Sequence, residues 1–186
     1  MEDVTINGLT IKIDYDQYAE NPLDMMSAEE RGVYFALRNP RYDLPWEIDA
    51  IQGDYRSWTD LAESLVAKDQ EMEGKVYKFV HWYEHSGIAV SLHDDEKYGG
   101  WDAAIVGVIF GETTEEIEMH FGPWKNYIEG DVYEYTIENP KNGELIDSCS
   151  GFYGYEDVYQ CAKAEALAFV WPSDAAYAFN ASKVHA

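Results

Sequence analysis

The alternation of apolar and polar residues predicts a β-hairpin near the start of the chain. Residues Val4 to Asp14 alternate, and Asn7 and Gly8 stand between the two arms. An Asn-Gly pair favours a two-residue turn because both residues tolerate positive φ. Residues 15–24 are polar and contain an Asn-Pro pair, which indicates a loop.

Helical start and stop signals mark two short helices. Ser27 and Thr113 each stand three residues before a glutamate, which is the spacing of a capping box. We expect the first helix to run to about Arg38. The helix that follows Thr113 is expected to end at Phe121, because a Gly-Pro pair comes next. A further helical turn is expected at residues 124–128.

Two longer helices show an apolar stripe at helical spacing, which predicts that one face of each is buried. The first opens at Ser57, and its stripe comprises Trp58, Leu61, Leu65 and Met72. The second covers residues 155–170, and its buried face is expected to comprise Val158, Cys161, Ala164 and Ala168.

Strand-like sequence dominates the stretch from Lys75 to Phe110. It predicts three strands, at residues 76–83, 88–92 and 103–110, with an acidic loop at 94–100 between the second and the third. A second hairpin is predicted at residues 131–138 and 144–149. Asn, Pro and Gly residues between its two arms supply the turn.

These elements predict an α+β fold, because strands outnumber helices and no regular strand–helix alternation is present. We expect a largely antiparallel sheet with helices packed on one face. A chain of 186 residues fits a single domain. Within residues 1–186 we expect an N-terminal hairpin and helices at 1–73, the central sheet and C-terminal helix at 74–171, and a tail at 172–186.

The charge balance disfavours two classes of partner. The chain carries 36 Asp and Glu against 13 Lys and Arg, a net charge of −23. The excess is spread along the chain and is steepest between residues 101 and 150, where 11 acids meet 2 bases. Such a body is repelled by nucleic acid and by anionic membranes and is attracted to basic surfaces. We therefore expect neither direct nucleic-acid binding nor membrane binding.

Cysteine usage and the N-terminus indicate a cytoplasmic protein. Cys149 and Cys161 are too few for a disulfide framework, so we expect both thiols to be reduced. The first residues contain no signal segment, and no apolar run approaches the ~20 residues that a membrane span requires.

One motif has the form of a zinc site. His81, Glu84 and His85 match the H-x-x-E-H pattern of a class of zinc peptidases. That chemistry requires a helix, which places both histidines on one face beside the metal. Here the flanking residues favour a strand, on which the two histidines would lie roughly 13 Å apart. We therefore expect no metal site, and a zinc-dependent hydrolase is kept only as an alternative.

A second set of polar residues would offer oxygen ligands to a hard cation: His93, Asp94, Asp95, Glu96 and Asp102. Its spacing is not that of a calcium loop, and a solvated loop is the alternative interpretation. Motifs for nucleotide binding and for serine hydrolysis are absent from the sequence. We therefore expect no catalytic residues, no cofactor and no enzymatic activity.

Several short motifs resemble those of a known group of proteins: Tyr83 to Ile88 (YEHSGI), Trp101-Asp102, Gly130 to Tyr135 (GDVYEY) and Asp147 to Gly154 (DSCSGFYG). Through them, residues 75–170 resemble an uncharacterised family of small proteins carried by bacteriophages and mobile elements. The resemblance implies a phage or mobile-element origin. It implies no catalytic residues, because the family has no assigned activity.

The acidic composition resembles that of DNA-mimicking anti-restriction and anti-CRISPR proteins, which occupy the basic cleft of a host defence enzyme. This resemblance implies a non-enzymatic phage-encoded inhibitor that binds the basic, nucleic-acid-binding site of a host defence or DNA-processing protein. The candidate partner-binding acids are Asp94, Asp95, Glu96, Glu112, Glu115, Glu116, Glu118, Glu129, Asp131 and Glu134.

Another class of function stays open beside this one. The charge would then serve only to keep the protein soluble. The protein would be a phage accessory or adaptor protein that binds a host protein through an aromatic patch, for which 15 Tyr and 6 Trp are present. The sequence also leaves the oligomeric state open, a homo-oligomer included.

Overall fold

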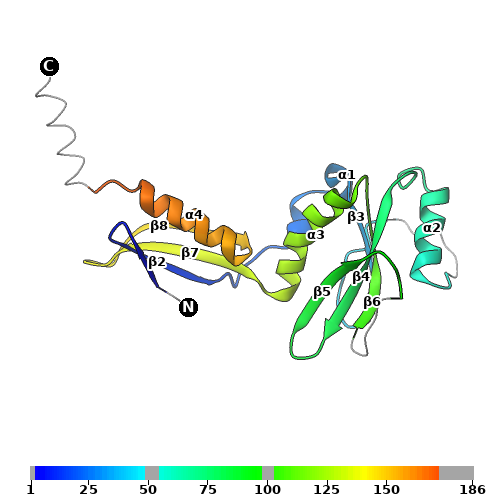
Figure 1. Ribbon diagram of the computed structural model, residues 1–186, viewed down its shortest axis with the longest axis horizontal. Coiled ribbons are helices and arrows are strands. Elements are labelled where there is room, and N and C mark those ends of the chain that lie inside the picture. The colour runs from blue at the N-terminus through cyan, green and yellow to red at the C-terminus, as the bar shows by residue number, and fades with distance from the viewer. Residues whose placement is uncertain (1–2, 49–54, 98–102, 172–186) are drawn as a thin grey trace, which may run out of the picture. The chain divides into compact units, whose positions relative to one another are not determined.

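The computed structural model describes residues 3–48, 55–97 and 103–171 of the chain. The chain forms two compact units, each described here by itself (Figure 1). The terminal unit comprises residues 1–19 and 132–186, so it contains both ends of the chain. The central unit comprises residues 20–131.

Both units combine antiparallel strands with helices, which confirms the α+β class. The strands form two sheets of four rather than one sheet. Their order is β1-β2-β7-β8 in the terminal unit and β3-β6-β4-β5 in the central unit. The second predicted hairpin therefore pairs with the N-terminal hairpin and not with the central strands. The expectation of one domain over residues 1–186 stays a prediction.

The N-terminal hairpin forms as predicted, from β1 (Val4–Ile6) and β2 (Leu9–Tyr15). Its turn residues Asn7 and Gly8 have φ values of 52° and 75°. This pair of positive φ angles matches the right-handed twist of the two strands, so the local sequence alone is sufficient to specify the turn.

The second hairpin is formed by β7 (Val132–Asn139) and β8 (Glu144–Tyr153). Strand β7 also pairs with β2, which places Ile11 opposite Ile137. Strand β8 runs past its predicted end at Cys149. It does so because Gly151 adopts a φ of 80° at an irregularity in the pairing, after which the two strands pair again.

Helix α4 (Tyr155–Ala168) covers one face of the terminal sheet (Figure 1). Its buried residues are Val158, Ala162 and Ala166, which pack with the apolar side chains of β2 and β7. The expected burial of Ala164 and Ala168 is wrong, since both are exposed. The buried positions recur every fourth residue from Val158. Because alanines occur at both buried and exposed positions of this helix, the sequence does not show which of them form the buried stripe.

The central sheet contains the three predicted strands, β4 (Val76–Glu84), β5 (Ile88–His93) and β6 (Ala103–Gly111). It also contains β3 (Tyr34–Leu37), where the first helix was expected to continue. That helix, α1 (Ala28–Arg31), ends at Gly32, which has a φ of 69°. All four residues of β3 are buried, and such a short apolar run is compatible with either helix or strand until its neighbours are known.

Helices cover both faces of the central sheet, whereas only one face was expected to be covered. Helix α2 (Trp58–Lys68) packs on one face with Leu61 and Leu65. Helix α3 (Thr114–Glu129) packs on the other with Ile117 and Trp124. Met72, predicted as part of the α2 stripe, lies beyond the end of that helix but is buried in the same cluster.

Helix α3 is continuous through Pro123, so its predicted end at Phe121 is wrong. Proline removes one hydrogen bond inside a helix and often breaks it. Here Phe121 and Trp124, on either side of the proline, are both buried in one hydrophobic cluster. Their packing holds the helical turns before and after Pro123 against the same sheet.

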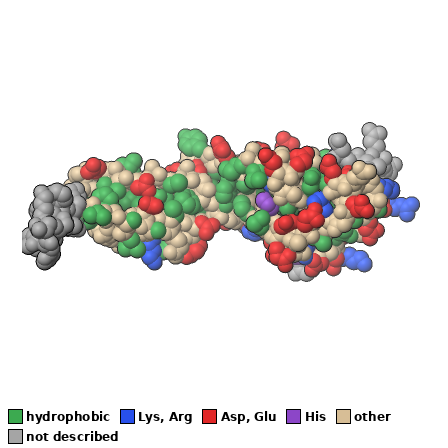
Figure 2. All heavy atoms as spheres, turned by 90° about the horizontal axis from the view of Figure 1, so that it is seen from above, with side chains coloured by type: hydrophobic (Ala, Val, Ile, Leu, Met, Phe, Trp, Pro, Cys, Tyr) green, Lys and Arg blue, Asp and Glu red, His purple; other side chains and the backbone are tan. Residues whose placement is uncertain are grey.

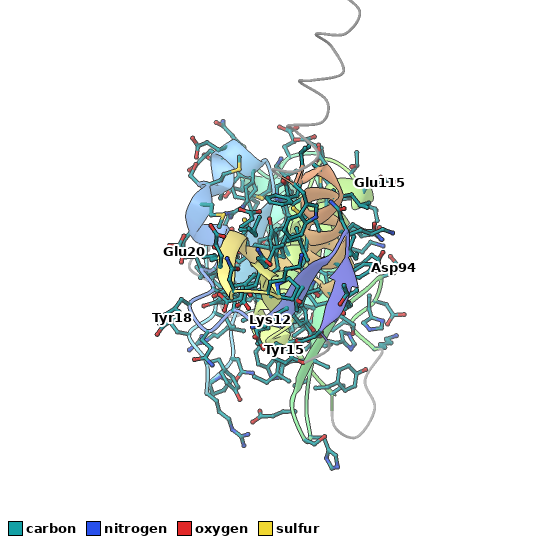
Figure 3. The ribbon with its side chains drawn as sticks, turned by 90° about the vertical axis from the view of Figure 1, so that its left-hand side faces the viewer. Lys12, Tyr15, Tyr18, Glu20, Asp94 and Glu115 are labelled. Atoms are coloured by element: carbon teal, nitrogen blue, oxygen red, sulfur yellow. The ribbon has the colours of Figure 1, made fainter. Side chains whose placement is uncertain are left out.

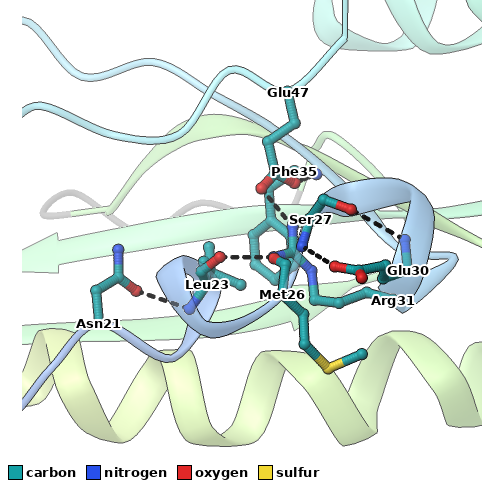
Figure 4. Close-up of polar contacts among 8 residues, drawn as sticks. All are labelled: Asn21, Leu23, Met26, Ser27, Glu30, Arg31, Phe35 and Glu47. Carbon is teal, nitrogen blue, oxygen red and sulfur yellow. Dashed lines mark hydrogen bonds and ion pairs between the residues drawn. The ribbon is translucent and has the colours of Figure 1, made fainter.

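A buried arginine ties the first helical segments to the central sheet (Figure 4). One guanidinium nitrogen of Arg31 donates to the backbone carbonyl oxygens of Leu23, in the 3-10 helix η1 (Pro22–Met25), and Met26, at 2.9 and 2.7 Å. The other pairs with the Glu47 carboxylate, which also accepts the Phe35 backbone N–H at 2.9 Å. This network connects η1, α1, β3 and the segment that follows β3.

That segment also closes the free edge of β3. The Leu37 N–H donates to the carbonyl oxygen of Pro45 at 2.9 Å, and the Glu47 N–H donates to that of Phe35 at 3.0 Å. The edge of the central sheet at β3 is therefore paired with this segment. Across residues 3–48, 55–97 and 103–171, no helix has the length and apolar character needed to cross a membrane.

Candidate acidic interface

The acidic excess is concentrated in the central unit. Residues 20–131 contain 24 acids and 9 bases, a net charge of −15, against 12 acids and 4 bases in the terminal unit. On the face seen in Figure 2, acidic side chains are spread over the central unit and outnumber Lys and Arg. Five of its nine bases form ion pairs within the described residues: Arg31, Arg41, Lys75, Lys78 and Lys125.

Lys75 is the centre of one group of acids. Its side chain is only 7% exposed. The ammonium group pairs with Glu112 at 2.7 Å, donates to the carbonyl oxygen of Gly32 at 3.4 Å and lies 5.4 Å from the ring centre of Tyr34. The Lys75 side chain is therefore held beneath the surface.

Three further acids act electrostatically on the same tyrosine. Burial raises the pKa of Tyr34, and the carboxylates of Glu71, Glu29 and Asp69 raise it further against the opposing effect of Lys75. These acids come from α1 and from the segment after α2, and they meet Glu112 only because the chain folds. Glu29, Asp69, Glu71 and Glu112 are called here the Lys75 cluster.

The Lys75 cluster continues onto the start of α3. The Glu112 N–H donates to the Glu116 carboxylate at 3.1 Å, and the Glu116 N–H donates to the Thr113 hydroxyl at 3.2 Å. Thr113 therefore caps α3, but the reciprocal bond of the predicted capping box is absent among these described residues, because the Glu116 carboxylate accepts the N–H of Glu112 and not that of Thr113. Glu115 and Glu118 follow on the first turns of the helix and are exposed. Together with the Lys75 cluster they form what is called here the acidic edge.

The acids of the loop after β5 have mainly structural contacts. The Glu96 carboxylate accepts hydrogen bonds from the Trp58 N–H and from the N–H and hydroxyl of Thr59, at 2.7–3.1 Å. Burial alone would raise the pKa of Glu96, but these hydrogen bonds hold it below its ordinary value. Glu96 therefore caps the N-terminus of α2, and its carboxylate is bound by groups of the protein itself.

Asp94 and Asp95 lie beside Glu96 and remain at the surface. Asp94 pairs with Lys78, and this interaction lowers the pKa of the aspartate. Asp95 accepts the Lys97 N–H at 2.9 Å and is close to His81. The acidic loop is thus tied to α2 through Glu96 and to strand β4 through Asp94. The proposed cation ligand Asp102 lies outside the described residues.

The remaining candidate acids do not join the acidic edge. Glu129 accepts the Val90 N–H of the edge strand β5 at 2.7 Å and pairs with Lys125. Asp131 is half-buried at the end of the central unit. Glu134 lies in β7 of the terminal unit, opposite Asp14. The fold therefore brings together Glu112, Glu115, Glu116 and Glu118, and adds Glu29, Asp69 and Glu71, which no sequence motif marked.

The three residues of the H-x-x-E-H motif lie in different environments. His81 lies within strand β4, as expected from its flanking sequence, and is fully buried with its ring centre 4.2 Å from that of His93. Glu84 pairs with Arg41, and His85 is exposed beyond the strand. Within the described part of the chain, no group of three or more His, Cys, Asp or Glu residues is arranged to hold a metal ion.

Both cysteine thiols are free, as expected. Cys149 is exposed on β8, and Cys161 is half-buried in α4. Comparisons of the chain with protein-family models, with curated proteins and with solved structures found no match. The resemblance to a family of phage proteins therefore stays a prediction, and the function is inferred from the surface alone.

Proposed function

We propose that the protein is a non-enzymatic inhibitor that binds the basic, nucleic-acid-binding site of a host defence or DNA-processing protein. The acidic edge carries this proposal: Glu112 pairs with the buried Lys75, Glu29, Asp69 and Glu71 act electrostatically on the adjacent Tyr34, and Glu115 and Glu118 are exposed on the first turns of α3. B-DNA presents one negative charge per ~1.7 Å of helix axis to the same kind of basic site. A fixed array of carboxylates can compete for those Lys and Arg side chains.

The acids stand on elements whose positions are fixed by buried contacts. The start of α3 is held by the Thr113 N-cap and by Ile117, and α1 is held by Arg31. Binding would then order few side chains, which limits its entropic cost. Charge attraction would also make association fast at low salt and slower as salt is added.

The setting of this activity follows from the sequence. The resemblance to phage proteins favours action in the cytoplasm of an infected bacterial host. The negative charge disfavours direct contact with nucleic acid, so the partner is a protein with a basic surface.

A triple variant tests the acidic edge. Glu71→Gln, Glu115→Gln and Glu118→Gln remove three exposed carboxylates while the Lys75–Glu112 pair stays intact. Glu144→Gln, Asp157→Asn and Glu165→Gln remove the same charge from exposed positions of the terminal unit and serve as the matched control.

The measurement has two steps. Host proteins captured by the wild-type protein at low salt are identified by mass spectrometry, and each is then tested for release of bound duplex DNA. We expect the wild type and the control triple variant to displace the DNA, and the acidic-edge variant to need at least about tenfold more protein. Failure of excess wild-type protein to displace DNA from any captured protein at low salt would rule out the DNA-mimic function.

A second candidate function rests on a row of tyrosines in the terminal unit. Tyr15 stacks on Tyr133 at 5.0 Å between ring centres, Tyr133 meets Tyr155 at 5.6 Å, and Tyr155 stacks on Tyr159 at 6.4 Å. Tyr15 is 62% exposed, and the neighbouring Tyr18 projects outward (Figure 3). Exposed aromatic groups of this kind anchor protein interfaces. They fit a phage accessory or adaptor protein that binds a host protein through an aromatic patch.

Salt separates the two candidates. Complexes held by the tyrosine row should survive about 0.5 M salt, at which exposed charges are screened within a few ångströms. They should be weakened by Tyr15→Ala with Tyr155→Ala and unaffected by the acidic-edge variant. The opposite pattern would assign binding to the carboxylates.

A further inference from the structure

A pocket of about 520 Å³ lies on the central unit, away from the residues of the acidic edge. Its walls include two arginines, three aromatic side chains and one acid: Arg38, Arg56, Trp46, Tyr55, Trp58 and Glu96. Its size falls in the range of small-molecule sites, which is roughly 300–1,000 Å³. The combination of arginine and aromatic side chains is unusual in a protein of this charge.

The side chains of both arginines are exposed. In the described part of the chain neither Arg38 nor Arg56 forms an ion pair, although the central unit contains 24 acids. Arg31 and Arg41, in contrast, are both paired. Two exposed guanidinium groups that line one pocket offer a place for an anion, since arginine binds phosphate and carboxylate groups through paired N–H donors.

The backbone at both arginines is held in place. The Arg38 N–H donates to the carbonyl oxygen of Val106 at 2.6 Å, which attaches it to strand β6. The Arg56 N–H donates to the Asp60 carboxylate at 3.2 Å, and Ser57, the N-cap of α2, follows it directly. The two guanidinium groups therefore project from fixed points on the sheet and on the helix.

The aromatic walls are anchored as well. Trp46 bridges to Ala36 through the backbone and keeps 41% of its surface exposed. Tyr55 and Trp58 pack against the hydrophobic cluster beneath α2. Exposed faces of such side chains stack on flat rings at small entropic cost, because they have few rotatable bonds.

Glu96 is the one acid among the described residues of these walls, and both of its oxygens already accept hydrogen bonds. The carboxylate accepts three hydrogen bonds from the first turn of α2, where the helix dipole also stabilises its charge. Glu96 therefore neutralises the helix terminus and leaves Arg38 and Arg56 to an external group.

Arg38 and Trp46 also line a second hollow of about 390 Å³, formed with Tyr42 and Leu44. The two residues stand between the two hollows, so a ligand bound at the arginines has room to extend on either side. Both hollows belong to the central unit.

We propose that this pocket binds a small molecule that joins a flat ring to a phosphate or carboxylate group. The anion is bound by Arg38 and Arg56, and the ring packs on Trp46, Tyr55 and Trp58. This site is distinct from the acidic edge and does not depend on the inhibitor function.

Isothermal titration calorimetry with four probes tests the ligand chemistry. Adenosine monophosphate and indole-3-acetate each contain a ring and an anion, whereas adenosine contains only the ring and inorganic phosphate only the anion. We expect one of the first two to bind with a 1:1 stoichiometry and at least about tenfold tighter than either half-probe. Which of the two binds more tightly tells a phosphate site from a carboxylate site.

Matched variants test the assigned residues. Arg38→Gln with Arg56→Gln should weaken binding of the ring-and-anion probe at least about tenfold. Arg41→Gln with Lys68→Gln removes the same two charges outside the pocket and should leave the affinity unchanged. Trp46→Leu should remove the preference for adenosine monophosphate or indole-3-acetate over their halves.

Two outcomes would overturn the proposal. One is the absence of binding by both ring-and-anion probes at concentrations up to about 5 mM, a limit that excludes even weak sites. The other is equal weakening by the two double variants, which would show that the probe responds only to overall charge. Circular dichroism of each variant confirms that the fold is retained.

Discussion

The sheet of the central unit is covered by helices on both faces, whereas the sheet of the terminal unit is covered by α4 on one face. This difference decides where each unit can place charged residues. The central strands are largely apolar runs, such as AAIVGVIFG in β6. The terminal strands alternate, as in LTIKIDY of β2, with Lys12 paired to Glu138 on the face away from α4.

Acids of the central unit are therefore excluded from most strand positions. They collect at helix starts, in turns and on exposed helix surfaces, and several of these sites converge around Lys75. In the terminal unit several acids lie on the strands, such as Glu134 and Glu138, which Thr136 separates in β7. The same acidic composition thus produces a concentrated surface on one unit and a dispersed one on the other.

The largest expected effect comes from the doubly covered sheet. Trp124→Ala removes a fully buried side chain that packs on Phe35 and Phe121 at 5.6 and 5.9 Å between ring centres. We expect the free energy of unfolding of the central unit to fall by about 3–5 kcal/mol. Hydrogen exchange should accelerate in β3 and β6 and stay unchanged in β2 and β7. Equal acceleration in both sheets would mean that the units unfold together.

A smaller effect is expected from the ion pairs. Glu47→Gln leaves the buried Arg31 without its charge partner, and the Glu47 side chain is only 18% exposed. Urea unfolding should show a loss of about 2–3 kcal/mol, less than a fully buried pair would lose. Glu138→Gln breaks a pair whose side chains are 36% and 29% exposed, and its effect should be much smaller and salt-dependent. Similar losses of unfolding free energy in Glu47→Gln and Glu138→Gln would contradict the expectation that the ion pair of the central unit contributes more to stability than that of the terminal unit.

The smallest effect concerns pH and the central unit alone. Burial, and then the neighbouring His93, lower the pKa of His81, and burial and Arg31 lower that of His120. The unfolded chain therefore binds more protons than the folded one as the pH falls below the ordinary histidine pKa of 6.5. Stability is fully present above that pH and is lost as the pH falls toward the folded-state pKa values.

Unfolding midpoints at pH 7.5 and 5.5 check this dependence. His81→Gln should reduce the difference between the two midpoints, and His85→Gln, at an exposed position, should leave it as in the wild type. Charge repulsion changes with pH in all three proteins and cancels from the comparison. An unchanged difference in His81→Gln would show that His81 does not carry the effect.

Elements specified by neighbouring residues were predictable from the sequence, and elements specified by distant contacts were not. The Asn7-Gly8 turn and the capping box at Ser27 depend on a few adjacent residues. The apolar run of β3 lacks a period and is compatible with helix, and its pairing with β6 decides that it is a strand. Helix α3 passes Pro123 because packing outweighs the local preference for a break.

The candidate sites divide in the same way. Glu112, Glu115, Glu116 and Glu118 could be grouped because they surround one helix start. Glu71 joins them only through the folded position of Tyr34. The pocket at Arg38 and Arg56 had no signal in the sequence, since the two arginines lie in different segments. Arg38 follows β3, and Arg56 precedes α2, so only the fold brings both to one pocket.

The hydrogen bond from Val90 to Glu129 has a consequence for self-association. An unpaired strand edge is a template on which another copy can add its own strand, the first step of many fibrils. Glu129 occupies a donor on the edge of β5 and places a negative charge there, while residues 45–47 occupy the opposite edge at β3. A strand from another copy would have to displace the Glu129 carboxylate at one edge or the paired residues 45–47 at the other. Both contacts therefore oppose edge-to-edge association of the central sheets of two copies at high protein concentration.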